Sequence, residues 1–367
     1  MFPVLLTLLT FTTLSTAWIP STVSAANTNQ IKGFNYAPED DFATKFKTAQ
    51  NLEGTSGFTS ARLFAMKSAK GNKFTEAFDA ANATGTTLLL TLWSSGDPVS
   101  DPLGDTAFAA EKAALEAALD QWVGKPPNNK PEDFKNMVIG ISVGSEDLYR
   151  SSVWGTPRQD DYGNTVEKII DFVEQTRVLL DSYALRGVIP VGHADTWVVW
   201  KNESTGYKLA SDLDWVGLND FTYWENLTVT DFAAFTGAVG EAQGASRQGG
   251  NPPVWVTESG WPVTGLDRGK ATVGTANAKT YWDGVGCQQL FGHFNTWWYT
   301  LHDPPYDPKA TPPQVRPQFA VTNADGDTKP LFDLSCDGAG TTQRSVKERG
   351  LEGSDNYRSS RRGRLSK

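Results

Sequence analysis

Two glutamates close stretches of sequence that are otherwise almost entirely apolar. Glu146 ends VIGISVGSE, and Glu258 ends PVWVTE. Desolvating a carboxylate is costly, so a carboxylate at the end of a segment that favours burial points to a function. Cleavage of a glycosidic bond needs two carboxyl groups, one that protonates the leaving oxygen and one that attacks the sugar or activates water. The sequence therefore offers the residue types for glycoside chemistry at two positions.

The elements that must position these glutamates can be predicted from the hydrophobic pattern. Runs such as TLLLTLW are nearly all apolar, as is expected of parallel strands that are buried on both faces. Eight short stretches rich in β-branched and apolar residues predict strands at 31–36, 60–65, 87–93, 138–144, 188–192, 214–219, 253–257 and 295–301.

Helical patterns lie between the predicted strands. Residues 108–122 have apolar side chains at helical spacing, and 166–184 carry a stripe formed by Ile169, Phe172, Val173, Leu179 and Leu180. Eight strand–helix units in about 300 residues predict an α/β fold, a single (β/α)8 TIM barrel. An open doubly wound sheet is disfavoured because no G-x-G-x-x-G turn occurs. In a barrel the strand ends meet at one opening, where Glu146 and Glu258 would face each other.

Composition excludes several function classes. The net charge is -9, and the segment from Gly340 to Lys367 carries eight basic and three acidic residues, so the body before it is near -14. An acidic body disfavours nucleic acid and phosphosugars as partners. No predicted strand ends in a lysine suited to Schiff-base chemistry, which disfavours an aldolase. The 13 tryptophans instead favour a ligand with flat apolar faces, such as a pyranose ring.

The N-terminal residues match a signal peptide at 1–25. An uncharged apolar run from Val4 to Leu14 precedes small residues at Val23 and Ala25, although the usual basic residue at the start is missing. A buried N-terminal helix is the alternative. We expect the catalytic domain at 26–338, a disordered basic tail at 339–367, and no later segment long enough to span a bilayer.

The cysteine and asparagine patterns also fit an exported protein. Cys287 and Cys336 are the only cysteines, and such a pair is expected to be bridged in an oxidising compartment. Candidate glycosylation sites are Asn82, Asn202 and Asn226. No metal or cofactor is expected, since the histidines, His193, His293 and His302, show no ligand spacing.

The motifs GFNYA, ARLF, VGSEDLYR, DWVGLNDFTYW, TESGWP and WWYTLHD occur in this order at barrel spacing. With them the chain resembles glycoside hydrolase family 17, most of all its fungal cell-wall branch. The resemblance implies a retaining double displacement on β-1,3-glucan, with Glu146 as acid/base and Glu258 as nucleophile. Retention requires carboxyl groups about 5 Å apart, a protonated Glu146 and an ionised Glu258.

The resemblance also assigns neighbours of the two glutamates. Arg62 and Tyr223 hold positions from which related barrels reach the nucleophile, although Arg62 could instead form a structural ion pair. Ser145 stands where many family members have an asparagine that contacts the sugar 2-hydroxyl. Asp303 is followed by proline where many relatives have Asp-Glu, which leaves the contacts beyond the scissile bond open.

Aromatic residues at or just past strand ends are candidates for stacking on sugars, with core packing as the alternative for each. They are Tyr36, Trp224, Trp261, Trp297 and Trp298. Asn219 closes the sixth predicted strand, where its amide could pair with sugar hydroxyls or cap the following turn.

We therefore expect a secreted, monomeric endo-β-1,3-glucanase without a cofactor. The alternative is a β-1,3-glucanosyltransferase, because the covalent intermediate is the same and only the acceptor differs. A non-catalytic glucan-binding wall protein is a third hypothesis, which the presence of both carboxylates disfavours.

Overall fold

The structure is a computed structural model that describes residues 30–337, apart from 38–40, 69–70, 73, 98, 128, 156–162 and 304–315. The predicted signal peptide (1–25) and basic tail (339–367) lie outside the described residues.

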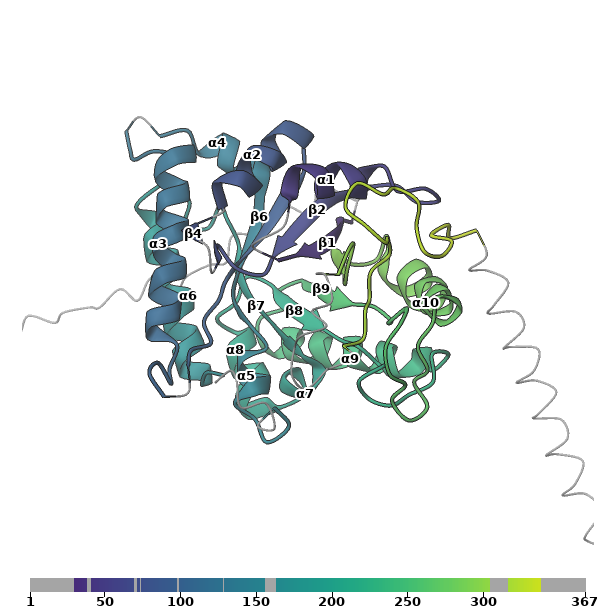
Figure 1. Cartoon of the computed structure of the whole chain (residues 1–367). Helices are drawn as coiled ribbons and strands as arrows, with labels where there is room; N and C mark the ends of the chain where they lie inside the picture. The colour runs from purple at the N-terminus through teal and green to yellow at the C-terminus, as the bar shows by residue number, and fades with distance from the viewer. Residues whose placement is uncertain are drawn as a thin grey trace, which may run out of the picture.

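Eight parallel strands form a closed barrel in the order β1-β10-β9-β8-β7-β6-β5-β2, with β1 paired to β2. The predicted (β/α)8 fold is thereby confirmed, and the strands lie at the centre of the molecule (Figure 1). The strands are β1 (Lys32–Tyr36), β2 (Phe58–Leu63), β5 (Thr87–Leu92), β6 (Val138–Ser145), β7 (Val191–Thr196), β8 (Val216–Asn219), β9 (Val254–Ser259) and β10 (Thr296–Trp298). A small hairpin, β3 (Lys67–Ser68) and β4 (Gly71–Asn72), follows β2.

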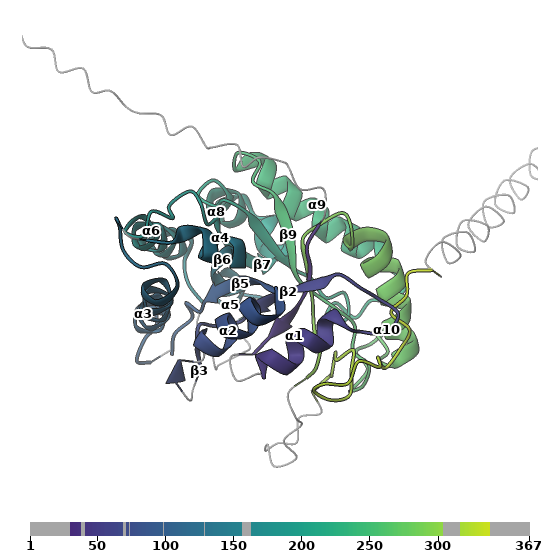
Figure 2. The ribbon, with the colours of Figure 1, turned by 90° about the horizontal axis from the view of Figure 1, so that it is seen from above.

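Helices surround the strands, as Figure 2 shows from above. They are α1 (Phe42–Gln50), α2 (Phe74–Thr84), α3 (Asp105–Trp122), α4 (Pro131–Met137), α5 (Asp147–Arg150), α6 (Val166–Asp181), α7 (Trp197–Trp200), α8 (Lys208–Ala210), α9 (Phe232–Gln248) and α10 (Thr275–Tyr281). Two π-helical turns, η1 (Glu203–Tyr207) and η2 (Trp282–Leu290), continue the chain after Asn202 and after α10. Of the helices in the described part of the chain, none is long and apolar enough to cross a membrane.

The apolar stripe predicted on 166–184 packs against the barrel and its neighbouring helix. Ile169, Phe172 and Val173 of α6 are buried, and the ring of Phe172 stacks on Phe108 of α3 at 4.0 Å between centroids. The side chain of Thr165 caps the start of α6 by accepting a hydrogen bond from the N–H of Lys168. This packing holds α3 and α6 side by side, as seen at the left of Figure 1.

Large rings fill the interior of the barrel near the N-terminal ends of its strands. The side chains of Trp215 and Trp255 stack at 4.4 Å, and Trp297 packs beside them. Glycines make room for these rings: a Cβ on Gly192 would lie 2.4 Å from the ring of Trp215, and one on Gly33 would lie 2.6 Å from Trp297. The barrel is therefore filled at this end, and polar side chains gather at the other.

The fifth barrel strand lies later in the sequence than predicted. The expected strand was 188–192, whereas β7 spans Val191–Thr196. Pro190 has no N–H to donate to a ladder, so the strand begins after it. His193 and Asp195 belong to the strand but are polar, which is why the apolar pattern ended at Gly192.

A disulfide ties the last described segment to the barrel. Cys287 of η2 bonds to Cys336, with the two Cα atoms 5.6 Å apart. Nearby, the indole N–H of Trp282 donates to the carbonyl oxygen of Leu334 at 3.0 Å, and Nζ of Lys279 donates to that of Ser335 at 3.0 Å. These bonds fix the segment before Cys336 against α10 and η2.

Candidate active site

Glu146 occupies a special backbone position between β6 and α5. Its φ angle is 59°, in the left-handed region that residues with a side chain seldom adopt. The N–H of Glu146 donates to the carbonyl oxygen of Ala194 on β7 at 2.8 Å, and its own carbonyl oxygen accepts from the N–H of Arg150 at 2.9 Å. The strained turn is thus held from both sides, as is common at functional sites.

Glu258 lies on β9 and contacts a buried cation. Nη1 of Arg62 lies 2.5 Å from Oε1 of Glu258, and the Arg62 side chain is fully buried while 12% of the Glu258 side chain is exposed. Arg62 also donates to Oδ1 of Asn35 and to Oγ of Ser145, each at 2.9 Å. The guanidinium therefore connects β1, β2, β6 and β9 beneath the two glutamates.

The amide of Asn219, at the end of β8, connects the two carboxylates. Nδ2 of Asn219 lies 3.2 Å from Oε1 of Glu146 and 3.2 Å from Oε1 of Glu258. Two oxygens that each lie 3.2 Å from one nitrogen are at most twice 3.2 Å apart. The hydroxyl of Thr257 donates to Oδ1 of Asn219 at 2.7 Å, which orients the amide with its N–H groups toward the glutamates.

The two carboxyl groups have different surroundings. Burial, followed by the negative charges of Glu258 and Asp195, raises the pKa of Glu146, while Arg150 and Asn219 lower it, and together they bring it to about 7. Glu146 is therefore largely protonated below neutral pH. Glu258 instead has the Arg62 cation at 2.5 Å.

Of the aromatic residues predicted to stack on sugars, Trp224 is the exposed one. It follows β8, has 37% of its surface exposed, and carries the guanidinium carbon of Arg268 5.0 Å from its ring centroid. Its ring also packs against Tyr223 at 4.8 Å. Beside these two contacts, the exposed 37% of Trp224 leaves ring surface for a ligand.

The other four aromatic candidates belong to the core, and their assignment as stacking residues is corrected by the structure. Each is at most 2% exposed. Their side chains contact other parts of the protein: Tyr36 packs on Phe46, Trp261 donates to the carbonyl of Thr272, Trp297 donates to Ser60, and Trp298 packs on Trp282. Their position near strand ends reflects packing between strands and helices.

Tyr223 does not donate to Glu258 as expected. Its hydroxyl donates to the carbonyl oxygen of Leu266 at 2.5 Å. The tyrosine beside the glutamates is instead Tyr299, directly after β10, whose pKa is raised by burial and by the charges of Glu258, Asp303 and Glu146. The predicted strand at 295–301 places Tyr299 inside the strand, whereas β10 ends at Trp298 and leaves Tyr299 at the barrel opening.

Comparison with known proteins shows the family of this chain. A model described as the BtgE/BtgC glycoside hydrolase domain matches residues 33–315. The chain belongs to this family. A relative named probable glucan endo-1,3-beta-glucosidase, from Aspergillus fumigatus, is 39% identical over 319 residues, which make up 83% of this chain and 65% of the relative. The glucan 1,3-beta-glucosidase of Saccharomyces cerevisiae is 26% identical over 70% of this chain and 75% of its own length.

Solved structures share the fold of this glycoside hydrolase domain. A β-1,3-glucanosyltransferase of glycoside hydrolase family 17 from Rhizomucor miehei superposes with a TM-score of 0.63, covering 84% of this chain and 98% of that chain at 22% identity. At this identity the likeness shows a common barrel. The domain described here spans less than two thirds of the length of the Aspergillus relative.

Asn35 is a further residue of the site, and the hydrophobic pattern does not single it out. It lies on β1, is 2% exposed, and accepts from Arg62 while its Nδ2 donates to the carbonyl oxygens of Trp297 at 3.0 Å and Thr257 at 3.1 Å. These bonds fix the amide so that its oxygen faces the guanidinium. The available signal was a polar residue inside the apolar motif GFNYA.

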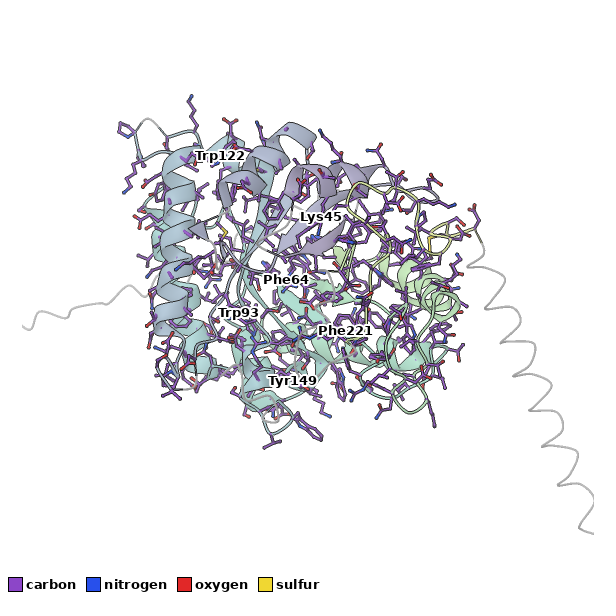
Figure 3. All side chains as sticks on the ribbon, in the orientation of Figure 1. Lys45, Phe64, Trp93, Trp122, Tyr149 and Phe221 are labelled. Carbon is purple, nitrogen blue, oxygen red and sulfur yellow. A yellow bond between two sulfur atoms is a disulfide. The ribbon has the colours of Figure 1, made fainter. Side chains whose placement is uncertain are left out.

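Arg150, on α5, forms a second cationic contact near Glu146. Its guanidinium donates to Oγ of Ser95 at 2.8 Å and to the carbonyl oxygen of Ser145, and its carbon lies 4.7 Å from the ring centroid of Trp93. Trp93 is partly exposed and, with Phe64, appears near the centre of the molecule in Figure 3. These residues follow β5 and β2, so they belong to the same end of the barrel.

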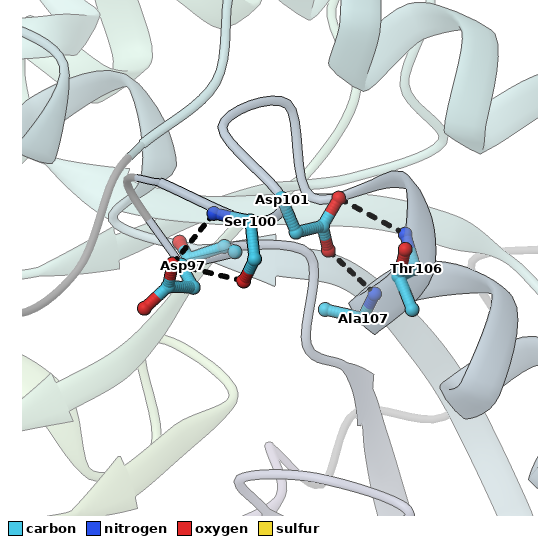
Figure 4. A pocket seen from close by; sticks show the side chains of 7 residues that line it. Asp97, Ser100, Asp101, Thr106 and Ala107 are labelled. Carbon is cyan, nitrogen blue, oxygen red and sulfur yellow. Dashed lines mark hydrogen bonds between the residues drawn. The ribbon is translucent and has the colours of Figure 1, made fainter.

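A polar hollow lies beside the loop between β5 and α3 (Figure 4). Asp97 accepts from the N–H of Ser100 at 2.7 Å, and Asp101 accepts from the N–H groups of Thr106 and Ala107 at the start of α3. These aspartates satisfy the backbone of the loop. In the described part of the chain no group of three or more His, Cys, Asp or Glu side chains is arranged to hold a metal ion.

Proposed function

We propose that this domain is a retaining endo-β-1,3-glucanase of glycoside hydrolase family 17, with Glu146 as acid/base and Glu258 as nucleophile. The observation that supports it best is the contact of one Asn219 amide nitrogen with both carboxylates. That contact limits the distance between Oε1 of Glu146 and Oε1 of Glu258 to at most twice 3.2 Å. Inverting enzymes hold their carboxyl groups roughly 6.5–9.5 Å apart to fit a water, whereas retaining enzymes hold them roughly 5–5.5 Å apart.

In the first step the protonated Glu146 gives its proton to the glycosidic oxygen while a Glu258 oxygen attacks the anomeric carbon. The bond from that carbon to the leaving oxygen breaks, and a glucosyl ester of Glu258 forms. Because the pKa of Glu146 is raised to about 7, its carboxyl group still carries this proton near neutral pH. Arg62 holds the attacking carboxylate in place from below.

In the second step the ionised Glu146 takes a proton from a water molecule, whose oxygen attacks the anomeric carbon and releases Glu258. The configuration at that carbon has been inverted twice and is therefore retained. The amide of Asn219 contacts both carboxylates, which keeps the two groups oriented toward one reacting ring.

The substrate class follows from the relatives. Several Aspergillus relatives at 37–39% identity are named as glucan endo-1,3-beta-glucosidases. The exposed ring of Trp224, five residues past the end of β8, fits stacking on a glucose unit.

Transfer to a second glucan chain is the other candidate function, and the structural neighbour from Rhizomucor miehei carries that name. The first step is identical, and the acceptor in the second step is a sugar hydroxyl in place of water. The Oγ of Ser145 accepts from Arg62 and from Asn219, which leaves its O–H group to donate to a sugar 2-hydroxyl.

We also propose that the protein is secreted. The disulfide between Cys287 and Cys336 needs an oxidising compartment to persist. The three acceptor asparagines, Asn82, Asn202 and Asn226, are exposed, as glycan attachment would require.

The deciding experiment is product analysis on linear β-1,3-glucan, with β-1,4- and β-1,6-glucan as controls. We expect shorter oligosaccharides from β-1,3-glucan alone, released initially as the β-anomer by NMR. Initial release of the α-anomer, or equal cleavage of the controls, would contradict the proposal. Products longer than a defined oligosaccharide substrate would identify transfer.

A further inference from the structure

A second charged pair is buried in the barrel wall behind Glu146. His193 and Asp195 are both on β7, and neither is exposed. They alternate with Gly192, which lies against the Trp215 ring inside the barrel, so they point outward, where His193 meets the ring of Trp200. The pair is thus outside the barrel lumen, on the side where α5 and α7 follow β6 and β7.

The contacts of His193 determine its charge. Nδ1 lies 2.6 Å from the carbonyl oxygen of Val143, and Nε2 lies 3.1 Å from Oδ2 of Asp195. A neutral imidazole has one N–H, so only the imidazolium satisfies both acceptors. Burial lowers the pKa of His193, but Asp195, Asp147 and the Val143 carbonyl raise it above its usual value.

Asp195 reaches from β7 to the segment that carries Glu146. Its Oδ2 accepts from the N–H of Leu148 at 3.0 Å, and its Oδ1 accepts from the N–H of Thr196 at 2.8 Å. Glu146 precedes the first residue of α5, yet its side chain makes no capping hydrogen bond. Asp195 therefore caps α5 in its place and leaves the Glu146 side chain available.

We propose that His193 and Asp195 form a permanent imidazolium–carboxylate pair that positions the turn of Glu146 and sets the charge around its carboxyl group. This inference rests on the proposed role of Glu146 as acid/base. Both are positioning residues, because they lie outside the barrel lumen. The other charged groups that act on Glu146 are Glu258 from β9 and Arg150 from α5, and His193 is also faced by Asp147.

The pair predicts opposite effects for its two members. Asp195→Asn removes the nearby negative charge, so the pKa of Glu146 should fall. His193→Gln removes the cation and leaves Asp195 charged, so the pKa of Glu146 should rise. Each midpoint should move by roughly half a pH unit or more, below the roughly 1–3 units that a charge in direct contact produces. A purely structural role would move both variants in the same direction or neither.

The test is a pH titration of the full chain labelled with δ-¹³C glutamate, followed by NMR. The Glu146 signal is assigned from its loss in Glu146→Gln. Asp214→Asn is the matched control: Asp214 accepts from the N–H of Val191 at the other end of β7 at 2.8 Å and pairs with Arg177 at 2.9 Å, far from Glu146 in the strand. Asp214→Asn should leave the titration midpoint of Glu146 unchanged. If Asp195→Asn and His193→Gln shift that midpoint in the same direction, the proposal is overturned.

A second measurement uses only the wild-type protein, so it does not depend on whether a variant folds. ¹⁵N NMR of wild-type histidines at pH 7 should show one buried residue with both ring nitrogens protonated, which is His193. A buried histidine with one unprotonated nitrogen would overturn the proposal. Neither NMR measurement uses a substrate, so a chain that cleaves no glucan but shows these signals would refute the proposed function and leave the His193–Asp195 pair intact.

Discussion

Nη1 of Arg62 lies 2.5 Å from Oε1 of Glu258, and no part of the Arg62 side chain reaches solvent. The same guanidinium donates to Asn35 and Ser145, so one side chain links four strands of the barrel. A buried cation stabilises a carboxylate only while its geometry holds, since an unpaired buried charge is strongly unfavourable. Arg62 therefore couples the stability of the barrel to the position of Glu258.

Replacing Arg62 should affect folding and turnover together. Arg62→Met leaves Glu258 without its cation, and we expect the free energy of unfolding to fall by about 3 kcal/mol, measured by urea denaturation. Arg62→Lys keeps the charge but not the planar fork, so kcat should fall with a smaller loss of stability. Arg186→Met, at an exposed pair with Glu174, is the control and should cost less than about 1 kcal/mol. An unchanged urea midpoint for Arg62→Met would contradict this coupling.

The two glutamates should be separable by chemical rescue. Glu258→Ala and Glu146→Ala should each lower turnover of β-1,3-glucan by at least about a thousandfold while binding persists. On an activated aryl glucoside, azide should enter from the face vacated by the missing carboxyl. It should give the α-azide with Glu258→Ala and the β-azide with Glu146→Ala, as identified by NMR. The reverse pairing of products would exchange the two roles.

Activity should decline as the pH rises through about 7. The first step needs Glu146 protonated, and its pKa is raised to about 7 by burial and by Glu258. The alkaline limb of kcat/KM therefore reports the loss of this proton in the free enzyme. Glu146→Gln should lose that limb on a substrate whose leaving group needs no protonation. A limb that persists in this variant would show that another group controls it.

Glu111 should make the stability of the fold depend on pH. Its carboxylate, on α3, accepts from the N–H groups of Met66 at 2.6 Å and Lys67 at 3.3 Å, yet burial raises its pKa to about 7. The folded state thus binds the proton more tightly than the unfolded state. The stabilisation is present below about pH 4.5 and is lost as the pH rises through 7, at most about 1.4 kcal/mol per pH unit.

Thermal melts from pH 4.5 to 8 test this dependence on Glu111. The melting temperature of Glu111→Gln should decline less with rising pH than that of the wild type. Glu146 is present in both proteins, so its contribution to the pH dependence is the same in each. Parallel curves for the two proteins would exclude Glu111 as the titrating group.

The aromatic residues should divide by exposure. Trp224→Ala should weaken binding of a β-1,3-glucan by about tenfold and leave the melting temperature nearly unchanged, since 37% of Trp224 is exposed. Trp297→Ala should instead cost about 3–5 kcal/mol of stability, because its ring fills the barrel interior. Calorimetric binding and urea denaturation measure the two effects. Equal losses of stability would contradict the assignment of Trp224 to the surface.

The barrel and the placement of the two glutamates at one opening were predictable because their signals are local. An apolar run that ends in a carboxylate shows both the buried strand and the polar residue at its end, as at Glu146 and Glu258. The fifth strand was misplaced because its polar residues, His193 and Asp195, are buried as a pair. Polar residues that are buried as a pair give the same hydrophobicity pattern along the chain as the polar residues of a loop.

The partners of each side chain depended on the tertiary structure. The tyrosine beside the glutamates is Tyr299 and not Tyr223, because the hydroxyl of Tyr223 is used by the Leu266 carbonyl. The pairing of β10 with β9 shifts register between Thr296 and Trp298, so alternation along the chain does not reveal which ring faces inward. Whether a tryptophan lies in the core or on the surface is decided by what packs over it.

The sequence by itself determined the fold class, the order of the strands along the chain and the position of the two glutamates at strand ends. Each of these depends on the pattern of apolar and polar side chains in consecutive residues. The tertiary structure alone decided that the amide of Asn219 meets both carboxylates, that Arg62 meets Glu258, and that Asp195 supports the turn of Glu146. These contacts join residues up to 196 positions apart. Their geometry arises only when the barrel closes.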